Sequence, residues 1–209
     1  MSFMSTIKIL MLIALFGHLL CGICDCLLIY TPSGKFGFQL MNDNDKMRET
    51  FRTMPLQNPM LSMLLGVLAL LMSCGGYFAL YLWMRQFSIA AAVIMLIAAA
   101  VFYIPGTAHH IFCGVAEWFY IRMGMTENAR EAIADFFKKT SVTMVVCYLG
   151  LIVLSITLFV MAVTGATTLP SWACIFNILL IASVLFPLRI GGAGNWAGAI
   201  MFLGLIFLI

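Results

Sequence analysis

Five ionisable side chains lie inside long apolar stretches of the sequence, and their types are those that proteins use for proton transfer. Two are carboxylic acids, Asp25 and Glu117, and three are histidines, His18, His109 and His110. A charged side chain at the centre of a lipid bilayer costs roughly 2.5–3.5 kcal/mol on insertion scales, so membrane helices keep such residues for protein interiors or wet cavities. We therefore expect these residues to face the inside of a helix bundle.

The spacing of these residues predicts two polar stripes on two helices. His18 precedes Asp25 by seven positions, and His110 precedes Glu117 by seven, so each pair lies on one helical face. A cysteine and a glycine lie between the members of each pair, and small residues let a neighbouring helix or a substrate approach closely. Two turns span about 10 Å, so any pairing of histidine with acid has to form between helices.

The composition requires a membrane around these helices. Of the 209 residues, 64% are hydrophobic and only 9% are charged, whereas soluble domains carry about 25% charged residues. The net charge of +3 is small and scattered, which excludes a nucleic-acid-binding surface. A spanning helix needs about 20 apolar residues, and six runs qualify: Ile7–Ile29, Met60–Met84, Ser88–Ile121, Thr140–Thr164, Pro170–Leu188 and Ala193–Ile209. We predict an all-α polytopic membrane protein, with six transmembrane helices in a single domain over residues 1–209.

The run Ser88–Ile121 is longer than a membrane requires, because a straight helix of that length measures about 50 Å. Pro105 lies within it, and proline removes a backbone hydrogen bond and clashes with the preceding turn. We expect the helix to break near residue 105, with Thr107 capping a second half that carries His109 and His110. A plain proline kink, with the end of the helix among the lipid headgroups, is the alternative.

Two segments between the runs are polar. Residues Pro32–Asn58 form a connection with a short helix expected around Asp45–Arg52. Residues Thr126–Lys139 predict one short amphipathic helix with Thr126 as its N-cap, acids early and lysines late. Its apolar residues share one face, which suits a helix lying on the cytoplasmic membrane surface or a solvated connector between spans.

The distribution of lysine and arginine predicts the orientation. Nine of the eleven basic residues lie in the first, third and fifth loops: Lys35, Lys46, Arg48, Arg52, Arg122, Arg130, Lys138, Lys139 and Arg189. Basic loops stay in the cytoplasm. We therefore expect a multi-pass protein of the plasma membrane, specifically a bacterial inner membrane, with both termini outside.

With this orientation, polar groups from four helices meet in the cytoplasmic half of the membrane. The candidate catalytic residues are Asp25, His109, His110 and Glu117, and the candidate substrate-binding residues are Arg189, Asn195, Asn177 and Tyr30. Carboxyl and imidazole groups act as general acids and bases, and a guanidinium binds a phosphate or carboxylate headgroup in bidentate fashion.

No cofactor is required by the sequence, and we assign no metal ligand. A metal held by histidine, aspartate and glutamate is a minor alternative, because these are zinc and iron ligands. His109 and His110 cannot share one ion easily, since neighbours on a helix point about 100° apart. All seven cysteines lie within the apolar runs, and we interpret them as small apolar filler.

A short motif ends the first run. Cys24-Asp25-Cys26-Leu27-Leu28-Ile29-Tyr30 resembles the Gly-Asp-x-Leu-Leu-x-Tyr ending found in a family of uncharacterised bacterial six-span membrane proteins, with Cys24 in place of the glycine. Gly191, Gly192 and Asn195, at the start of the last run, are similar in placement. The resemblance implies a six-span bundle and carries no activity with it.

Three functions suit a membrane protein with an internal polar pocket. We expect an acid/base enzyme that acts on a lipid or another apolar substrate from the cytoplasmic side. The alternatives are a non-catalytic subunit or interaction protein, in which the polar groups join helices, and a small proton-coupled transporter. The expected partner is membrane lipid, with a second copy of the chain or another membrane protein as alternatives, and no nucleic acid.

Overall fold

The computed structural model describes residues 2–209 and is built almost entirely of helices. In chain order the elements are α1 (Phe3–Ile29), β1 (Tyr30–Thr31), β2 (Gly34–Lys35), the 3-10 helix η1 (Phe38–Asn42), α2 (Asn44–Phe51), α3 (Gln57–Met84), α4 (Ile89–Arg122), α5 (Glu127–Thr140), α6 (Val142–Val163), the 3-10 helix η2 (Ser171–Phe176), α7 (Ile178–Leu185) and α8 (Ala193–Leu208). The all-α prediction is confirmed. The two-residue strands form an antiparallel hairpin that the sequence did not predict.

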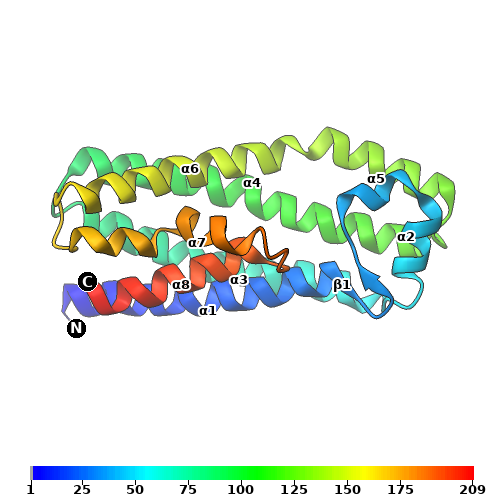
Figure 1. Cartoon of the computed structure of the whole chain (residues 1–209), viewed down its shortest axis with the longest axis horizontal. Helices are drawn as coiled ribbons and strands as arrows, with labels where there is room; N and C mark the ends of the chain where they lie inside the picture. The colour runs from blue at the N-terminus through cyan, green and yellow to red at the C-terminus, as the bar shows by residue number, and fades with distance from the viewer. Residues whose placement is uncertain (1) are drawn as a thin grey trace.

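The long helices form two layers. Helices α1, α3 and α8 pack side by side in one layer, α4 and α6 form the other, and α3 also packs against α4 (Figure 1). Small residues allow the close crossings: a Cβ atom on Gly17 of α1 would lie 2.6 Å from the backbone nitrogen of Ser73, and one on Gly150 of α6 would lie 2.5 Å from that of Phe102. Close backbone approach at small residues is typical of helix packing inside a membrane.

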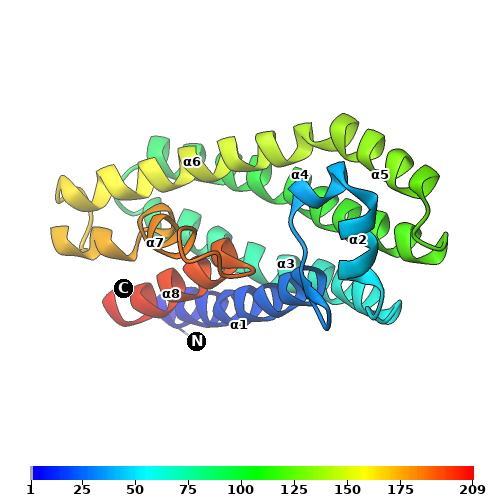
Figure 2. The ribbon, with the colours of Figure 1, turned by 45° about the vertical axis from the view of Figure 1, so that its right-hand side comes forward.

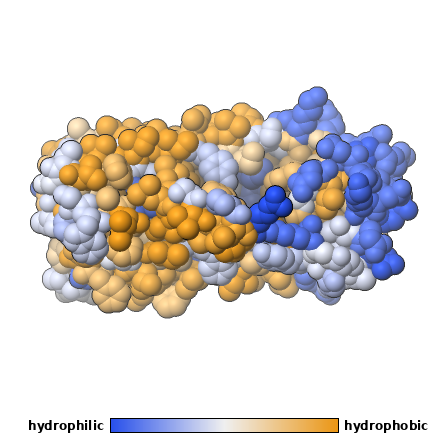
Figure 3. All heavy atoms as spheres, in the orientation of Figure 1, coloured by the Kyte–Doolittle hydropathy of each residue, from blue (hydrophilic) through white to orange (hydrophobic). Residues whose placement is uncertain are grey.

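Four helical segments of the described chain are long and apolar enough to cross a bilayer: Phe3–Ile29, Gln57–Met84, Ile89–Arg122 and Glu127–Val163. Their outward faces expose many large apolar side chains, such as Leu64, Leu71, Ile104 and Val153. On the face shown in Figure 3, apolar surface covers most of the bundle, and hydrophilic surface gathers at the end formed by α2 and α5 (Figures 1 and 3). These features indicate a transmembrane helical protein.

The run predicted to cross the membrane over residues 170–188 is not a single helix. It divides at Asn177, whose backbone is extended and which separates η2 from α7. The Asn177 side chain accepts a hydrogen bond from the Leu179 nitrogen at 3.0 Å and donates one to the Ser155 carbonyl at 2.7 Å. An asparagine that bonds nearby backbone groups competes with the helix, and this explains the break. Helix α8 follows as a shorter apolar helix of 16 residues.

The predicted break near residue 105 is wrong. Helix α4 is continuous from Ile89 to Arg122, with Pro105 inside it. Thr107 does not cap a new helix, because its hydroxyl donates to the Tyr103 carbonyl at 2.8 Å within the same helix. The helix continues past the proline because it is held on both sides, by α3 and by α6.

The two polar segments fold together at one end of the bundle, which we call the polar end. The helix expected around Asp45–Arg52 is α2, and Thr126 caps α5 as predicted, accepting a hydrogen bond from the Ala129 nitrogen at 3.3 Å. The apolar face of α5 does not lie on the membrane surface. It packs into a second core made of Phe36, Met41, Met47, Phe51, Met54, Ala116, Tyr120, Ala129, Ile133 and Phe137.

Candidate functional site

A cavity of about 530 Å³ lies between the two helix layers. Its volume is within the range of about 300–1,000 Å³ that is usual for ligand pockets. Six of the polar residues singled out in the sequence line it: Asp25, His109, His110, Glu117, Arg189 and Asn195. Asn177 and Tyr30 are not among the lining residues, since Asn177 lies at the break between η2 and α7, and the Tyr30 hydroxyl is bound to the backbone of Gly191.

A continuous chain of hydrogen bonds links side chains of α3, α1 and α8, the helices that form one layer of the bundle. The Asn195 amide nitrogen donates to Asp25 Oδ2 at 2.8 Å, so the amide oxygen faces His18 Nδ1, at 3.1 Å. That nitrogen must therefore carry the hydrogen. The other ring nitrogen of His18 accepts from the Tyr77 hydroxyl at 3.3 Å, and the order of donors and acceptors is fixed from Tyr77 to Asp25.

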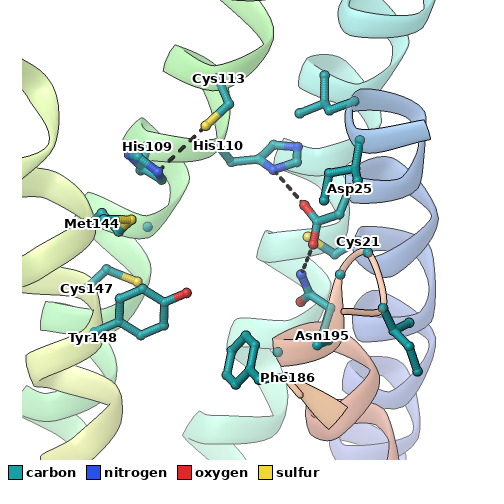
Figure 4. A pocket seen from close by; sticks show the side chains of 18 of the residues that line it. Cys21, Asp25, His109, His110, Cys113, Met144, Cys147, Tyr148, Phe186 and Asn195 are labelled. Carbon is teal, nitrogen blue, oxygen red and sulfur yellow. Dashed lines mark hydrogen bonds and ion pairs between the residues drawn. The ribbon is translucent and has the colours of Figure 1, made fainter. Parts of the chain in front are cut away.

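His110 reaches from α4 across the cavity to the same aspartate (Figure 4). Its Nε2 lies 3.0 Å from the carbonyl oxygen of Ser62, and this nitrogen must donate because a carbonyl only accepts. The Ser62 hydroxyl donates elsewhere, to the Cys24 carbonyl at 2.9 Å. The remaining ring nitrogen, Nδ1, faces Asp25 Oδ1 at 3.4 Å. Two acceptors face each other there, so a proton or a cation has to lie between them.

Two glycines allow the histidines to take these positions. A Cβ atom on Gly66 of α3 would lie 2.0 Å from His110 Nε2, and one on Gly198 of α8 would lie 2.5 Å from the His18 ring. Both rings are buried against the backbone of a neighbouring helix. We call the set Tyr77, His18, Asn195, Asp25, His110 and Ser62 the α1 side of the cavity.

Further polar and sulfur groups of the lining come from α6 (Cys147 and Tyr148) and from α4 (His109, Cys113 and Glu117), and we call this set the α6 side. The ring of His109 lies toward α6 (Figure 4), where its Nδ1 donates to the Thr143 hydroxyl at 3.3 Å, and its Nε2 is 3.6 Å from the Cys113 sulfur. The Glu117 side chain is buried, and its Oε2 has no hydrogen-bond partner in the described chain. Burial of an unpaired polar atom is costly, so this oxygen is available to a ligand.

The turn between α7 and α8 closes one edge of the cavity. The Gly191 backbone is held from two directions, because its nitrogen donates to the Tyr30 hydroxyl at 3.0 Å and its carbonyl accepts from the Trp196 indole at 2.7 Å. Lys35 donates to the carbonyl of Arg189, so the hairpin β1–β2 contacts the same turn. Both cations line the cavity at this edge.

Gly192 sets the path of this turn. Its φ angle is +72°, in the left-handed region, and a Cβ atom on it would lie 3.0 Å from the Gly22 backbone of α1. The absence of a side chain at both positions lets α8 begin directly beside α1, where Asn195 meets Asp25.

Two aromatic residues near α6 and α7 line the cavity and are partly exposed. Tyr148 of α6 and Phe186, which follows α7, both line it, yet 44% and 50% of their surfaces are exposed. Both residues therefore border the cavity and the outer surface of the molecule.

Sequence reasoning missed several members of the α1 side. His18, Ser62 and Tyr77 were not placed in the candidate site, and Cys21 was interpreted as filler. The Cys21 sulfur, an Asp25 oxygen and a His110 nitrogen all lie within 4.8 Å of one another. The signal for Cys21 was present, because residues four apart on a helix share a face, and Cys21 precedes Asp25 by four.

Comparison with known proteins identifies a family but no activity. No curated protein and no solved structure matches the chain. A family model described as a family of unknown function, DUF6796, matches residues 1–208. Because the match covers nearly all of its length, the chain belongs to this family of unknown function.

Proposed function

We propose that the protein is a membrane-embedded enzyme that performs acid/base chemistry on an apolar, lipid-like substrate with a polar head. The observation that carries the proposal is the contact between Asp25 and His110, two proton-transfer groups from different helices at 3.4 Å on the wall of a cavity of about 530 Å³. The other oxygen of Asp25 accepts a hydrogen bond from Asn195, and the other ring nitrogen of His110 donates one to the Ser62 carbonyl.

In the proposed reaction, the Asp25–His110 pair exchanges one proton with the substrate. Asn195 holds the second oxygen of Asp25, and Ser62 holds the second nitrogen of His110, so the reacting atoms keep a fixed direction toward the cavity. General acid–base catalysis depends on such positioning within hydrogen-bond reach. The unpartnered oxygen of Glu117 provides a second contact for the substrate on the α6 side.

The polar head would lie at the Lys35–Arg189 edge of the cavity. Both cationic side chains line it there, and a guanidinium or ammonium binds phosphate or carboxylate groups. The apolar part would extend past Tyr148 and Phe186 into the bilayer, since both residues line the cavity and are partly exposed.

For the membrane arrangement, we propose six crossings, with η2–α7 and α8 completing the four long helices. The turn between α7 and α8 contacts Gly22, Cys26 and Tyr30, near the end of α1 that leads to the polar end. The polar end carries most of the lysines and arginines, so we place it in the cytoplasm of a plasma membrane, with both termini on the opposite side. The termini lie at the same end of the molecule (Figures 1 and 2), which accords with an even number of crossings.

The test begins with the native ligand. Protein purified in lipid nanodiscs is extracted, and co-purified amphiphiles are identified by mass spectrometry. In Gly194→Leu the new side chain enters the cavity, where a Cβ atom would meet nothing within 4 Å. We expect this variant to lose the ligand. Gly75→Leu is the matched control, because Gly75 lies outside the cavity and its Cβ would meet only Leu10, at 3.7 Å.

Proton transfer is then followed directly. The loaded protein is transferred to deuterated water, and uptake of deuterium at a carbon atom of the ligand is measured. We expect uptake or conversion with the wild type, and at least a hundredfold loss in Asp25→Asn and in His110→Gln. A ligand that takes up no deuterium and is not converted would overturn the enzyme assignment and favour a binding or transport role. Equal rates in all three proteins would overturn it as well.

A further inference from the structure

The space between Asp25 and His110 borders on a third group with metal-binding chemistry. Cys21 lies one turn before Asp25 on α1, and its sulfur, an Asp25 oxygen and a His110 nitrogen are mutually within 4.8 Å. Cys21 is buried, and all three side chains line the same cavity. We propose that Cys21, Asp25 and His110 bind one divalent metal ion, with Zn²⁺ as the preferred ion.

The geometry of the pair fits a shared ion. Two tetrahedral ligands at zinc-to-nitrogen and zinc-to-oxygen distances lie about 3.3 Å apart, and Asp25 Oδ1 and His110 Nδ1 are 3.4 Å apart. Both atoms present lone pairs to the space between them, because His110 donates its hydrogen from Nε2 to the Ser62 carbonyl. An ion in this space takes the place of the proton that the pair shares in the proposed function, so the ion-bound protein would not exchange that proton with a substrate.

The surroundings supply the outer contacts that metal sites use. A metal-bound histidine commonly donates its other ring hydrogen to a backbone carbonyl, as His110 does to Ser62, and a metal-bound carboxylate accepts further hydrogen bonds, as Asp25 does from Asn195. Three protein ligands leave a fourth position open, which is typical of catalytic rather than structural zinc. Because all three side chains line the cavity, a fourth ligand would come from a molecule within it.

The charges of the three ligands favour a divalent ion. A Cys21 thiolate and an Asp25 carboxylate together carry two negative charges, and neutral His110 carries none. A divalent ion makes the site neutral, whereas a monovalent or trivalent ion leaves a net charge among apolar helices, which is costly. Cysteine, histidine and aspartate together are ligands that zinc accepts.

The experiment measures metal binding without any substrate, so its result does not depend on the proposed reaction. Metal-stripped protein in nanodiscs is incubated with Zn²⁺ or Co²⁺, passed through a desalting column and analysed for metal content. We expect one ion per chain, and for Co²⁺ an absorption band from charge transfer between thiolate and metal. The variants Cys21→Ser, Asp25→Asn and His110→Gln should each weaken binding at least tenfold.

Two neighbouring residues provide matched controls. Cys24→Ser alters another buried cysteine of α1, and His109→Gln alters the adjacent histidine, and neither residue belongs to the cluster. Both variants should bind the ion as the wild type does and show the same charge-transfer band. Failure of the wild type to retain one ion per chain, or loss of binding in the controls to the same extent, overturns the metal site. In either case the proton-bridged pair of the proposed function is unaffected.

Discussion

On the α1 side of the cavity, Asp25, Asn195 and His18 share hydrogen bonds in a continuous chain, whereas on the α6 side Glu117 keeps a buried oxygen without a partner. Both sides belong to the same bundle and use carboxyl and imidazole groups. They differ in where the partners come from: the α1 side joins groups from four helices, while His109 bonds to its own helix and to the adjacent α6. The comparison indicates that one wall is preorganised and the other is left free for a ligand.

The largest effect is expected from a methyl group added behind His110. In Gly66→Ala the new Cβ would lie 2.0 Å from His110 Nε2, so the ring has to leave the Ser62 carbonyl and Asp25. We expect the free energy of unfolding to fall by about 2–3 kcal/mol, measured by thermal unfolding in detergent. The matched change on the α6 side is Gly106→Ala, whose Cβ would meet the Cys147 sulfur at 3.0 Å. It should cost less than about 1 kcal/mol. Equal losses would contradict the comparison.

A smaller loss is expected when the chain of hydrogen bonds is opened. Asn195→Ala leaves Asp25 Oδ2 and His18 Nδ1 without partners, and we expect a loss of about 1–3 kcal/mol. His109→Ala on the α6 side should cost about half as much or less, because the Thr143 hydroxyl keeps its bond to the Thr140 carbonyl. Chemical denaturation of the two variants side by side tests the difference, and a greater loss from His109→Ala would reverse our assignment of the preorganised wall.

At Glu117 we expect a substitution to raise the stability of the protein rather than to lower it. Its side chain is 3% exposed, and one of its oxygens has no partner, so replacement by methionine removes an unsatisfied buried group at similar volume. We expect Glu117→Met to raise the stability by about 1 kcal/mol while weakening retention of the bound amphiphile. A destabilised variant with full ligand retention would show that Glu117 is a packing residue.

The smallest effect on stability is expected outside the cavity, at a charged residue of the polar end. The backbone nitrogen of Lys46 donates to the exposed Asp43 side chain, which lowers the pKa of that carboxyl below its ordinary value of 3.8. A lowered pKa stabilises the folded form above the unfolded value, and this contribution is lost as the pH falls through the lower, folded value. The protection factors of the α2 amides against hydrogen exchange should therefore fall slightly on acidification below about pH 4, and Asp43→Ala should abolish that dependence.

The elements of the fold could be predicted from the sequence to a large extent, because apolar runs and N-caps are local signals. Thr126 and the acidic and basic ends of α5 are examples. The break at Asn177 and the continuity past Pro105 could not, since both depend on contacts with α6. The partner of His110 could not be predicted from local sequence either. Asp25 is on another helix, and the two residues meet only because the two helix layers pack together.

The bond between Asp25 and Asn195 joins positions 170 residues apart. During synthesis α1 is therefore made long before its amide partner, and until α8 docks, Asp25 Oδ2 and His18 Nδ1 must be satisfied by water or by lipid headgroups. Assembly of the hydrogen-bonded chain is thus a late event in biogenesis, and it distinguishes a finished bundle from one whose C-terminal helix has failed to insert.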